Sequence, residues 1–207
     1  QVDPSNYAVR DAIMADPSCF LMNEIAPGGY TPRFVGNITD TSLTVGRRGD
    51  ITDGFLSGHS YDLSGSVGRN EADFGLKNTV NPSMGPDTPR DFYTGSYIEL
   101  EKVFNFDLTR QVDSMSIAYG AEWREETFEV ISGEEASWKA GKYALQGFNV
   151  GSHGFAGFSP DSQGAFTRRS YGVYVDLENQ VSDELLLGGS FRYVDYSSFG
   201  DTNDFKF

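Results

Sequence analysis

Residues 114–126 read SMSIAYGAEWREE, and apolar and polar side chains alternate along most of them. One face of the extended chain carries the apolar set Met115, Ile117, Tyr119, Ala121 and Trp123. The residues between them are small or charged. Alternation with a period of two is typical of a β-strand that separates two different environments. This stretch therefore predicts a strand with one apolar and one polar face.

The same alternation recurs along the chain. It is found, most weakly in the first case, in residues 33–51, 61–70, 103–112, 170–179 and 185–193. Together with residues 114–126, these segments predict an all-β protein of about six antiparallel strands. Residues 7–23 lack the alternation and are predicted to belong to a long loop with a short amphipathic turn before Pro17.

The predicted connections alternate in length. Residues 52–59, 111–114 and 180–184 are short turns, whereas residues 71–102 and 131–168 are long and rich in Gly, Pro, Ser and Asn. Short turns at one end and long loops at the other are typical of outer-membrane β-barrels. A soluble β-sandwich gives similar alternation. The long loops and the aromatic residues near strand ends, such as Trp123 and Tyr171, favour the barrel.

Composition excludes several classes of function. The chain of 207 residues has a formal net charge of −14, which disfavours nucleic acid as a partner and binding to anionic membranes through a basic patch. With one cysteine, no intrachain disulfide can form, and two distant histidines predict no Cys/His metal site. No apolar run approaches the ~18 residues of a transmembrane helix.

No motif predicts catalysis, a metal or a cofactor. The carboxylates of Glu125 and Glu126, like those of Glu134 and Glu135, point to opposite faces if extended, so neither pair forms a glycosidase dyad. Residues 201–204 (DTND) carry side chains with oxygen atoms at alternate positions, as calcium-binding loops do. They lack the turn glycine and the distal glutamate of an EF-hand loop. The glycines of residues 147–157 precede no helix that would make a phosphate loop. We therefore expect a protein that is not an enzyme.

Five phrases are more specific than the periodicity. They are TPRFVGNITD (31–40), YDLSGSVGRN (61–70), NTVNPSMGP (78–86), AYGAEWREE (118–126) and RYVDYSSFGD (192–201). In this order and spacing they resemble the β-barrel of TonB-dependent outer-membrane receptors. The last is similar to the family phrase RYEDYSDFG, from which Val194 and Ser198 depart. The resemblance covers nearly all of residues 31–207.

The resemblance implies an antiparallel transmembrane β-barrel of about 22 strands with an N-terminal plug in its lumen. No plug domain and no TonB box is recognised in this sequence. About six strands cannot close, because the smallest outer-membrane barrels have about 8. Residues 1–207 are therefore expected to be a partial barrel, a fragment of the receptor's barrel domain without the plug.

The resemblance also implies a function. It is the import of a scarce nutrient, siderophore-bound iron, cobalamin or an oligosaccharide, through the outer membrane, which the chain crosses several times. The expected partners are the TonB–ExbB–ExbD energy-coupling complex, outer-membrane lipid, the substrate and, in some receptors, a surface lipoprotein. Two alternatives stay open: a passive porin-like channel, and a secreted, soluble, carbohydrate-binding β-sandwich.

Candidate ligand contacts lie in the loops at residues 81–92 and 138–158. They are Asn81 and four aromatic residues, Trp138, Tyr143, Phe148 and Phe155, whose rings are suited to stack on a flat ligand or a sugar. The alternative is that these side chains pack the loops against each other. On the polar face of the strands, a second set is expected to pair in the lumen or to contact the plug: Glu122, Arg124, Asp176, Glu178 and Arg192.

Overall fold

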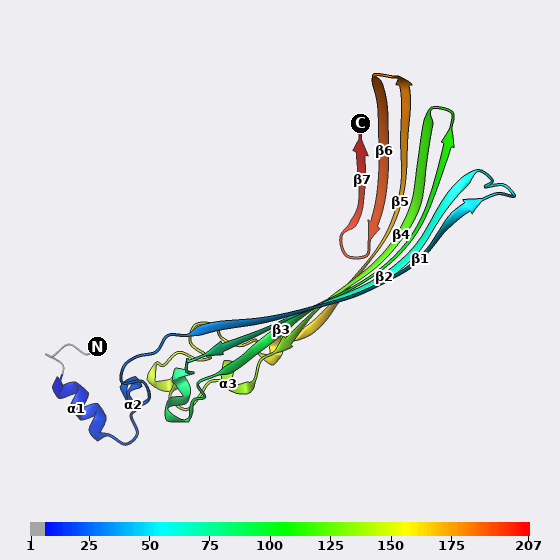
Figure 1. Cartoon of the computed structure of the whole chain (residues 1–207). Helices are drawn as coiled ribbons and strands as arrows, with labels where there is room; N and C mark the ends of the chain where they lie inside the picture. Colours follow the sequence, from blue (N-terminus) through cyan, green and yellow to red (C-terminus); the bar gives the residue numbers. More distant parts are fainter. Residues whose placement is uncertain (1–6) are drawn as a thin grey trace. The chain divides into compact units, whose positions relative to one another are not determined.

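The computed structural model describes residues 7–207, and its main feature is one sheet of seven strands in the order β1 to β7 (Figure 1). The strands are β1 (Arg33–Ile51), β2 (His59–Lys77), β3 (Phe92–Val112), β4 (Met115–Ser132), β5 (Gly164–Ser182), β6 (Leu185–Tyr196) and β7 (Gly200–Lys206). Each strand neighbours the next along the chain. The predicted all-β meander of a partial barrel is confirmed.

The short elements lie before β1 and in the long connections. They are α1 (Tyr7–Ala15), α2 (Met22–Ile25), α3 (Glu135–Trp138) and the 3₁₀ helices η2 (Pro82–Asp87), η3 (Ala144–Gln146) and η4 (Pro160–Ser162). The amphipathic turn predicted before Pro17 is the helix α1. No helix among residues 7–207 is long and apolar enough to cross a bilayer.

The prediction of about six strands was one too low. Residues 200–206 are rich in polar side chains, yet they pair with β6, with Phe205 opposite Phe191 and Asp201 opposite Asp195. A ladder of backbone hydrogen bonds does not depend on the side chains, so a neighbouring strand draws polar segments into the sheet. For the same reason most strands extend beyond their predicted ends.

The predicted alternation of connections is confirmed. Residues 52–58, 113–114 and 183–184 form short turns, and Asp113 adopts a positive φ of 51° in the tightest of them. Residues 78–91 and 133–163 form the long connections. Figure 1 shows the three short turns at the same end of their hairpins.

The chain divides into two compact units. The first, here called the loop unit, holds residues 7–39, Glu71–Tyr97 and Glu129–Gly164, and therefore both long connections. Among its described side chains, Phe20, Leu76, Val80 and Phe92 are apolar and buried. The second, here called the turn unit, holds Asp40–Asn70, Ile98–Phe128 and Ala165–Phe207, and therefore the three short turns named above and a fourth at residues 197–199 between β6 and β7.

One face of the turn unit is apolar and open. Its exposed large side chains include Leu63, Val67, Phe104, Phe106, Tyr171, Val173, Leu177 and Leu187. A soluble β-sandwich would cover such a face with a second sheet, because contiguous apolar patches of this kind are rare on soluble monomers. The open face favours lipid as its neighbour.

Candidate functional site

The opposite face of the turn unit carries a set of ion pairs and a hydrogen bond, here called the polar ladder (Glu101, Asp107, Glu122, Arg124, Tyr174 and Arg192). An Nη of Arg192 lies 3.0 Å from a carboxylate oxygen of Glu122, and an Nη of Arg124 lies 3.1 Å from one of Glu101. Arg124 also approaches Glu122 at 3.6 Å. The hydroxyl of Tyr174 donates to Asp107 at 2.7 Å. The polar ladder therefore links side chains of β3, β4, β5 and β6.

The expected pairing of charges on this face is found for Glu122, Arg124 and Arg192. Asp176 and Glu178 make no ion pair with any other residue of the described chain. The sequence analysis missed Glu101, because its strand was predicted to begin only at residue 103, whereas β3 begins at Phe92.

In the loop unit the two long connections are joined into a loop cluster (residues 78–91 and 133–158). The backbone N–H of His153 donates to the carbonyl of Val80 at 2.8 Å, and that of Tyr143 donates to Ser83 at 2.9 Å. The hydroxyl of Thr79 donates to the carbonyl of His153 at 2.6 Å. Hydrogen bonds between backbones hold the two loops in one fixed arrangement.

Asn81 lies at the centre of the loop cluster and is fully buried, at 0% exposure. Its amide donates to the carbonyls of Ala136 and Lys139 at 2.8 and 2.9 Å, and its side-chain oxygen accepts from the hydroxyl of Ser83 at 2.7 Å. The same oxygen accepts from the backbone N–H of Ser83 and caps η2. The amide groups of Asn81 are therefore engaged within the protein.

Two of the predicted aromatic contacts, Tyr143 and Phe148, are brought together by a third ring. Phe20 is only 3% exposed and packs against Tyr143 and Phe148, with ring centroids 5.1 and 5.4 Å apart. Lys142 lies over the ring of Tyr143 and pairs with Asp87 at 3.0 Å. The hydrogen bond to Asp87 raises the pKa of Lys142, so this cation persists in the loop cluster.

Phe155 belongs to a different group of rings. Its centroid lies 5.5 Å from that of Phe34 and 5.8 Å from that of Phe158, and Phe158 stacks on Tyr97 at 4.9 Å. Trp138 is half-buried and donates from Nε1 to the carbonyl of Gly133 at 3.1 Å. All five predicted loop contacts thus have partners within the loop unit.

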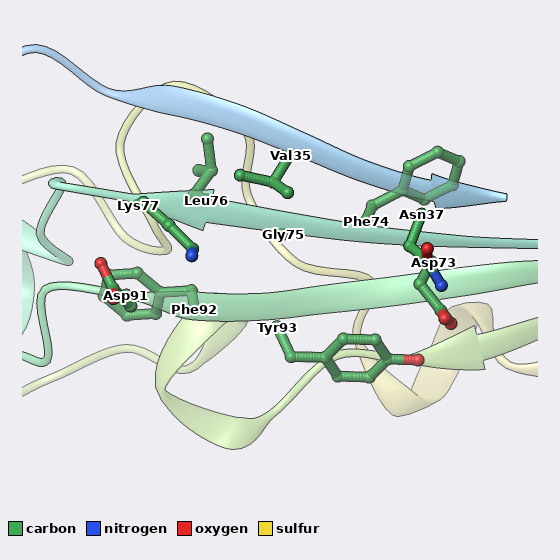
Figure 2. Close-up of a pocket in the computed structure, with 10 residues that line it drawn as sticks. All are labelled: Val35, Asn37, Asp73, Phe74, Gly75, Leu76, Lys77, Asp91, Phe92 and Tyr93. Carbon is green, nitrogen blue, oxygen red and sulfur yellow. The ribbon is translucent and has the colours of Figure 1, made fainter.

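A shallow groove of about 320 Å³ lies across the ends of β1, β2 and β3 in the loop unit (Figure 2). Its lining is mostly apolar, with Val35, Phe74 and Leu76 among the side chains that Figure 2 draws. The carboxylate of Asp73 in the lining accepts a hydrogen bond from Ser96 at 2.5 Å. The groove offers surface for an apolar group, and its polar residues lie toward its two ends, Asn37 and Asp73 at one and Lys77 and Asp91 at the other.

A group that the sequence analysis missed lies at the turn between β6 and β7. Tyr196 and Phe199 stack with centroids 4.4 Å apart, and the guanidinium of Arg168 lies 5.6 and 5.7 Å from the two centroids. Arg168 is held by Glu126, whose oxygen accepts from Nη2 at 2.6 Å and from Nε at 3.0 Å. Phe199 is 61% exposed. We call this group the aromatic platform (Glu126, Arg168, Tyr196 and Phe199).

The sequence carried a signal for the two rings of the aromatic platform, but none for the ion pair behind them. Tyr196 and Phe199 flank a two-residue polar step, which is a turn signal between aromatic residues. An exposed ring backed by another ring and an ion pair is suited to bind the flat face of a sugar or an aromatic group.

Comparison with known proteins gives one result for the chain as a whole. Residues 20–207 match the family model described as TonB dependent receptor-like, beta-barrel. No curated protein and no solved structure gives a significant match. The matched range contains all seven strands and both long connections.

Proposed function

Because the chain belongs to the TonB-dependent receptor-like β-barrel family, a family of outer-membrane transporters, we propose that it forms a section of the wall of an energy-driven nutrient importer. The observation that carries the proposal is the family match over residues 20–207, which includes every strand of the sheet. The open apolar face of the turn unit supports contact with lipid. The polar ladder on the other face supports a wet or plug-filled lumen.

The sheet is open, and this supports a larger barrel. β1 and β7 each have a neighbour on one side only, and nearly all of β1 is exposed. Unpaired backbone groups in lipid cost several kcal/mol each, so a spanning sheet must close on itself. We propose that both edges pair with further strands, in a barrel of about 22 strands that surrounds a plug.

The aromatic platform supports a role in substrate capture. Its exposed ring is preorganised by Tyr196 and by the Arg168–Glu126 pair, whereas the five predicted loop contacts are engaged in packing. We propose that the aromatic platform stacks on a ring of the substrate and that the loop cluster shapes the entrance. Tyr143, Phe148, Phe155 and Trp138 then contribute through their exposed edges, and Asn81 by ordering the loops.

The proposal is tested by uptake in cells that carry the intact receptor. Labelled ferric siderophores, cobalamin and oligosaccharides are offered to cells with and without TonB–ExbB–ExbD. We expect one substrate class to accumulate, and its uptake to fall at least about tenfold without the complex, because the barrel wall supplies no energy of its own. A passive porin-like channel would transport equally well in both strains.

The aromatic platform gives a more local prediction. Phe199→Ala should weaken binding of the transported substrate up to about tenfold, since stacking on an exposed ring is worth roughly 0.5–1.5 kcal/mol. The matched control is Phe55→Ala, which removes a 99% exposed ring from a short turn and should leave affinity unchanged. Equal affinities for both variants and the parent receptor would remove the aromatic platform from the site. Equilibrium binding to the purified receptor in detergent provides the measurement.

A further inference from the structure

A second set of charges lies on the apolar face of the turn unit, away from the polar ladder. Lys102 Nζ and Arg169 Nε each lie 2.8 Å from a different carboxylate oxygen of Glu125. Glu125 is 14% exposed, whereas Lys102 and Arg169 are 46% and 58% exposed. We call these three residues the cationic row. Its net charge is +1, in a chain whose formal net charge is −14.

The register of β3, β4 and β5 follows from side-chain contacts. Lys102 contacts Glu125 across β3 and β4, and Glu126 contacts Arg168 across β4 and β5. The next row on the same face lies two residues nearer the turns at residues 113–114 and 183–184. It consists of Phe104, Trp123 and Tyr171. An aromatic row beside charges is the pattern that marks the interface between the apolar band of a membrane barrel and water.

The depth of the cationic row agrees with this assignment. β3 and β4 are joined by the two residues 113–114, and the cationic row lies about ten residues from this turn on each strand, where a bilayer crossing of ~9–11 residues ends. The intervening side chains on this face include the exposed Phe104, Phe106 and Val112. The cationic row therefore lies at the level of the lipid head groups, on the side away from the turns at residues 52–58, 113–114 and 183–184.

The chemistry of the cationic row suits a phosphate. Glu125 accepts one hydrogen bond from Nε of Arg169 and one from Nζ of Lys102. The side chains of Lys102 and Arg169 make no other hydrogen bond within the described chain. Both Nη groups of Arg169 and two protons of Lys102 are left to donate. A guanidinium fork beside an ammonium group matches the tetrahedral oxygens of a phosphate.

We propose that Lys102 and Arg169 bind the phosphate of an anionic lipid in the leaflet on the side of the long connections. The exposed rings and aliphatic side chains next to the cationic row would contact the acyl chains of the same molecule. A free phosphate ion would gain nothing from that apolar surface. In outer-membrane barrels the longer loops face the exterior, so the lipid is a phosphorylated glycolipid of the outer leaflet.

The test measures lipid retained by the intact receptor. Purified receptor is exchanged into detergent containing lipid A with both phosphates, or the same lipid A without phosphates, and bound lipid is counted by native mass spectrometry. We expect the phosphorylated form to be retained at least about tenfold better. The double variant Lys102→Thr/Arg169→Thr should abolish this preference. Glu125→Gln, which keeps both cations, should strengthen it.

Controls separate the proposal from its alternatives. Lys139→Thr/Lys142→Thr removes two exposed cations from the loop cluster and should leave the preference intact. Millimolar inorganic phosphate should not displace the lipid, and displacement would mean a site for free phosphate instead. Equal retention of the two lipids, or a preference that Glu125→Gln lowers, would overturn the proposal. A heat-modifiability gel shows that each variant is folded. Because the lipid assay contains no transported substrate, its result does not depend on whether the transport proposal is correct.

Discussion

Leu177→Lys is expected to lower the free energy of unfolding by about 2–3 kcal/mol in lipid vesicles, because a charge on the lipid face costs most near the bilayer midplane. Leu177 is 43% exposed on the apolar face of the turn unit and pairs across the sheet with Gly189. It lies about midway between the aromatic row of Phe104, Trp123 and Tyr171 and the short turn at residues 183–184. The loss corresponds to roughly a 30- to 100-fold shift of the folding equilibrium, measurable by urea unfolding of the intact receptor.

The control places the same charge on the other face. Ser190 lies opposite Asp176 in the pairing of β5 with β6, so Ser190→Lys gains an acidic partner. Its stability should stay within about 0.5 kcal/mol of the parent receptor. Equal losses in both variants would mean that the apolar face of the turn unit does not contact lipid. Refolding of the receptor without detergent would return the soluble β-sandwich to consideration.

Gly141→Ala is expected to open the loop cluster. A Cβ at residue 141 would lie 2.3 Å from the carbonyl oxygen of Ser83 and 2.6 Å from the Cα of Met84. These are backbone atoms, which cannot move aside without breaking the hydrogen bonds between the two long connections, among them Tyr143 N–H to Ser83 at 2.9 Å. Limited trypsin digestion of the intact receptor at Lys139 and Lys142 should accelerate about thirtyfold, equivalent to about 2 kcal/mol of local opening.

Gly28→Ala is the matched control, since nothing lies within 4 Å of a Cβ at that position. It should leave the tryptic pattern unchanged. Substrate affinity should fall in Gly141→Ala if the loop cluster shapes the entrance. An unchanged digestion rate in Gly141→Ala would mean that the two connections are not held together in the membrane as they are in this structure.

The sequence was sufficient to predict where six of the strands lie, but it predicted their end residues poorly. Alternation is a local property, and it found the central segments of six strands with the correct faces. β7 was missed because its Asp201, Asn203 and Asp204 follow no apolar pattern. Its pairing depends on β6, which lies beside it only after the chain has turned back at residues 197–199. Strand ends such as that of β3, which begins at Phe92 rather than at residue 103, depend on neighbouring backbone in the same way.

The candidate site shows the same division. From their residue type and their place in long loops, five residues were predicted to contact a ligand, because Asn and aromatic residues in such loops are common ligand contacts. They are Asn81, Trp138, Tyr143, Phe148 and Phe155. No local pattern indicates that Asn81 is buried, since its partners at Ala136 and Lys139 lie 55 and 58 residues along the chain. The aromatic platform depends on Arg168 and Glu126 meeting Tyr196 from different strands, which no local pattern reports.

By itself the sequence determined the class of structure, the two unlike faces of each strand and the alternation of short turns with long connections. These follow from side-chain period and turn composition, which act over a few residues. Only the tertiary structure decided which charges meet. The turn at residues 113–114 is short enough to set Lys102 against Glu125, but Arg169 reaches Glu125 only because residues 133–163 fold and return the chain in register. Register across a long connection is set by packing and backbone pairing between distant segments.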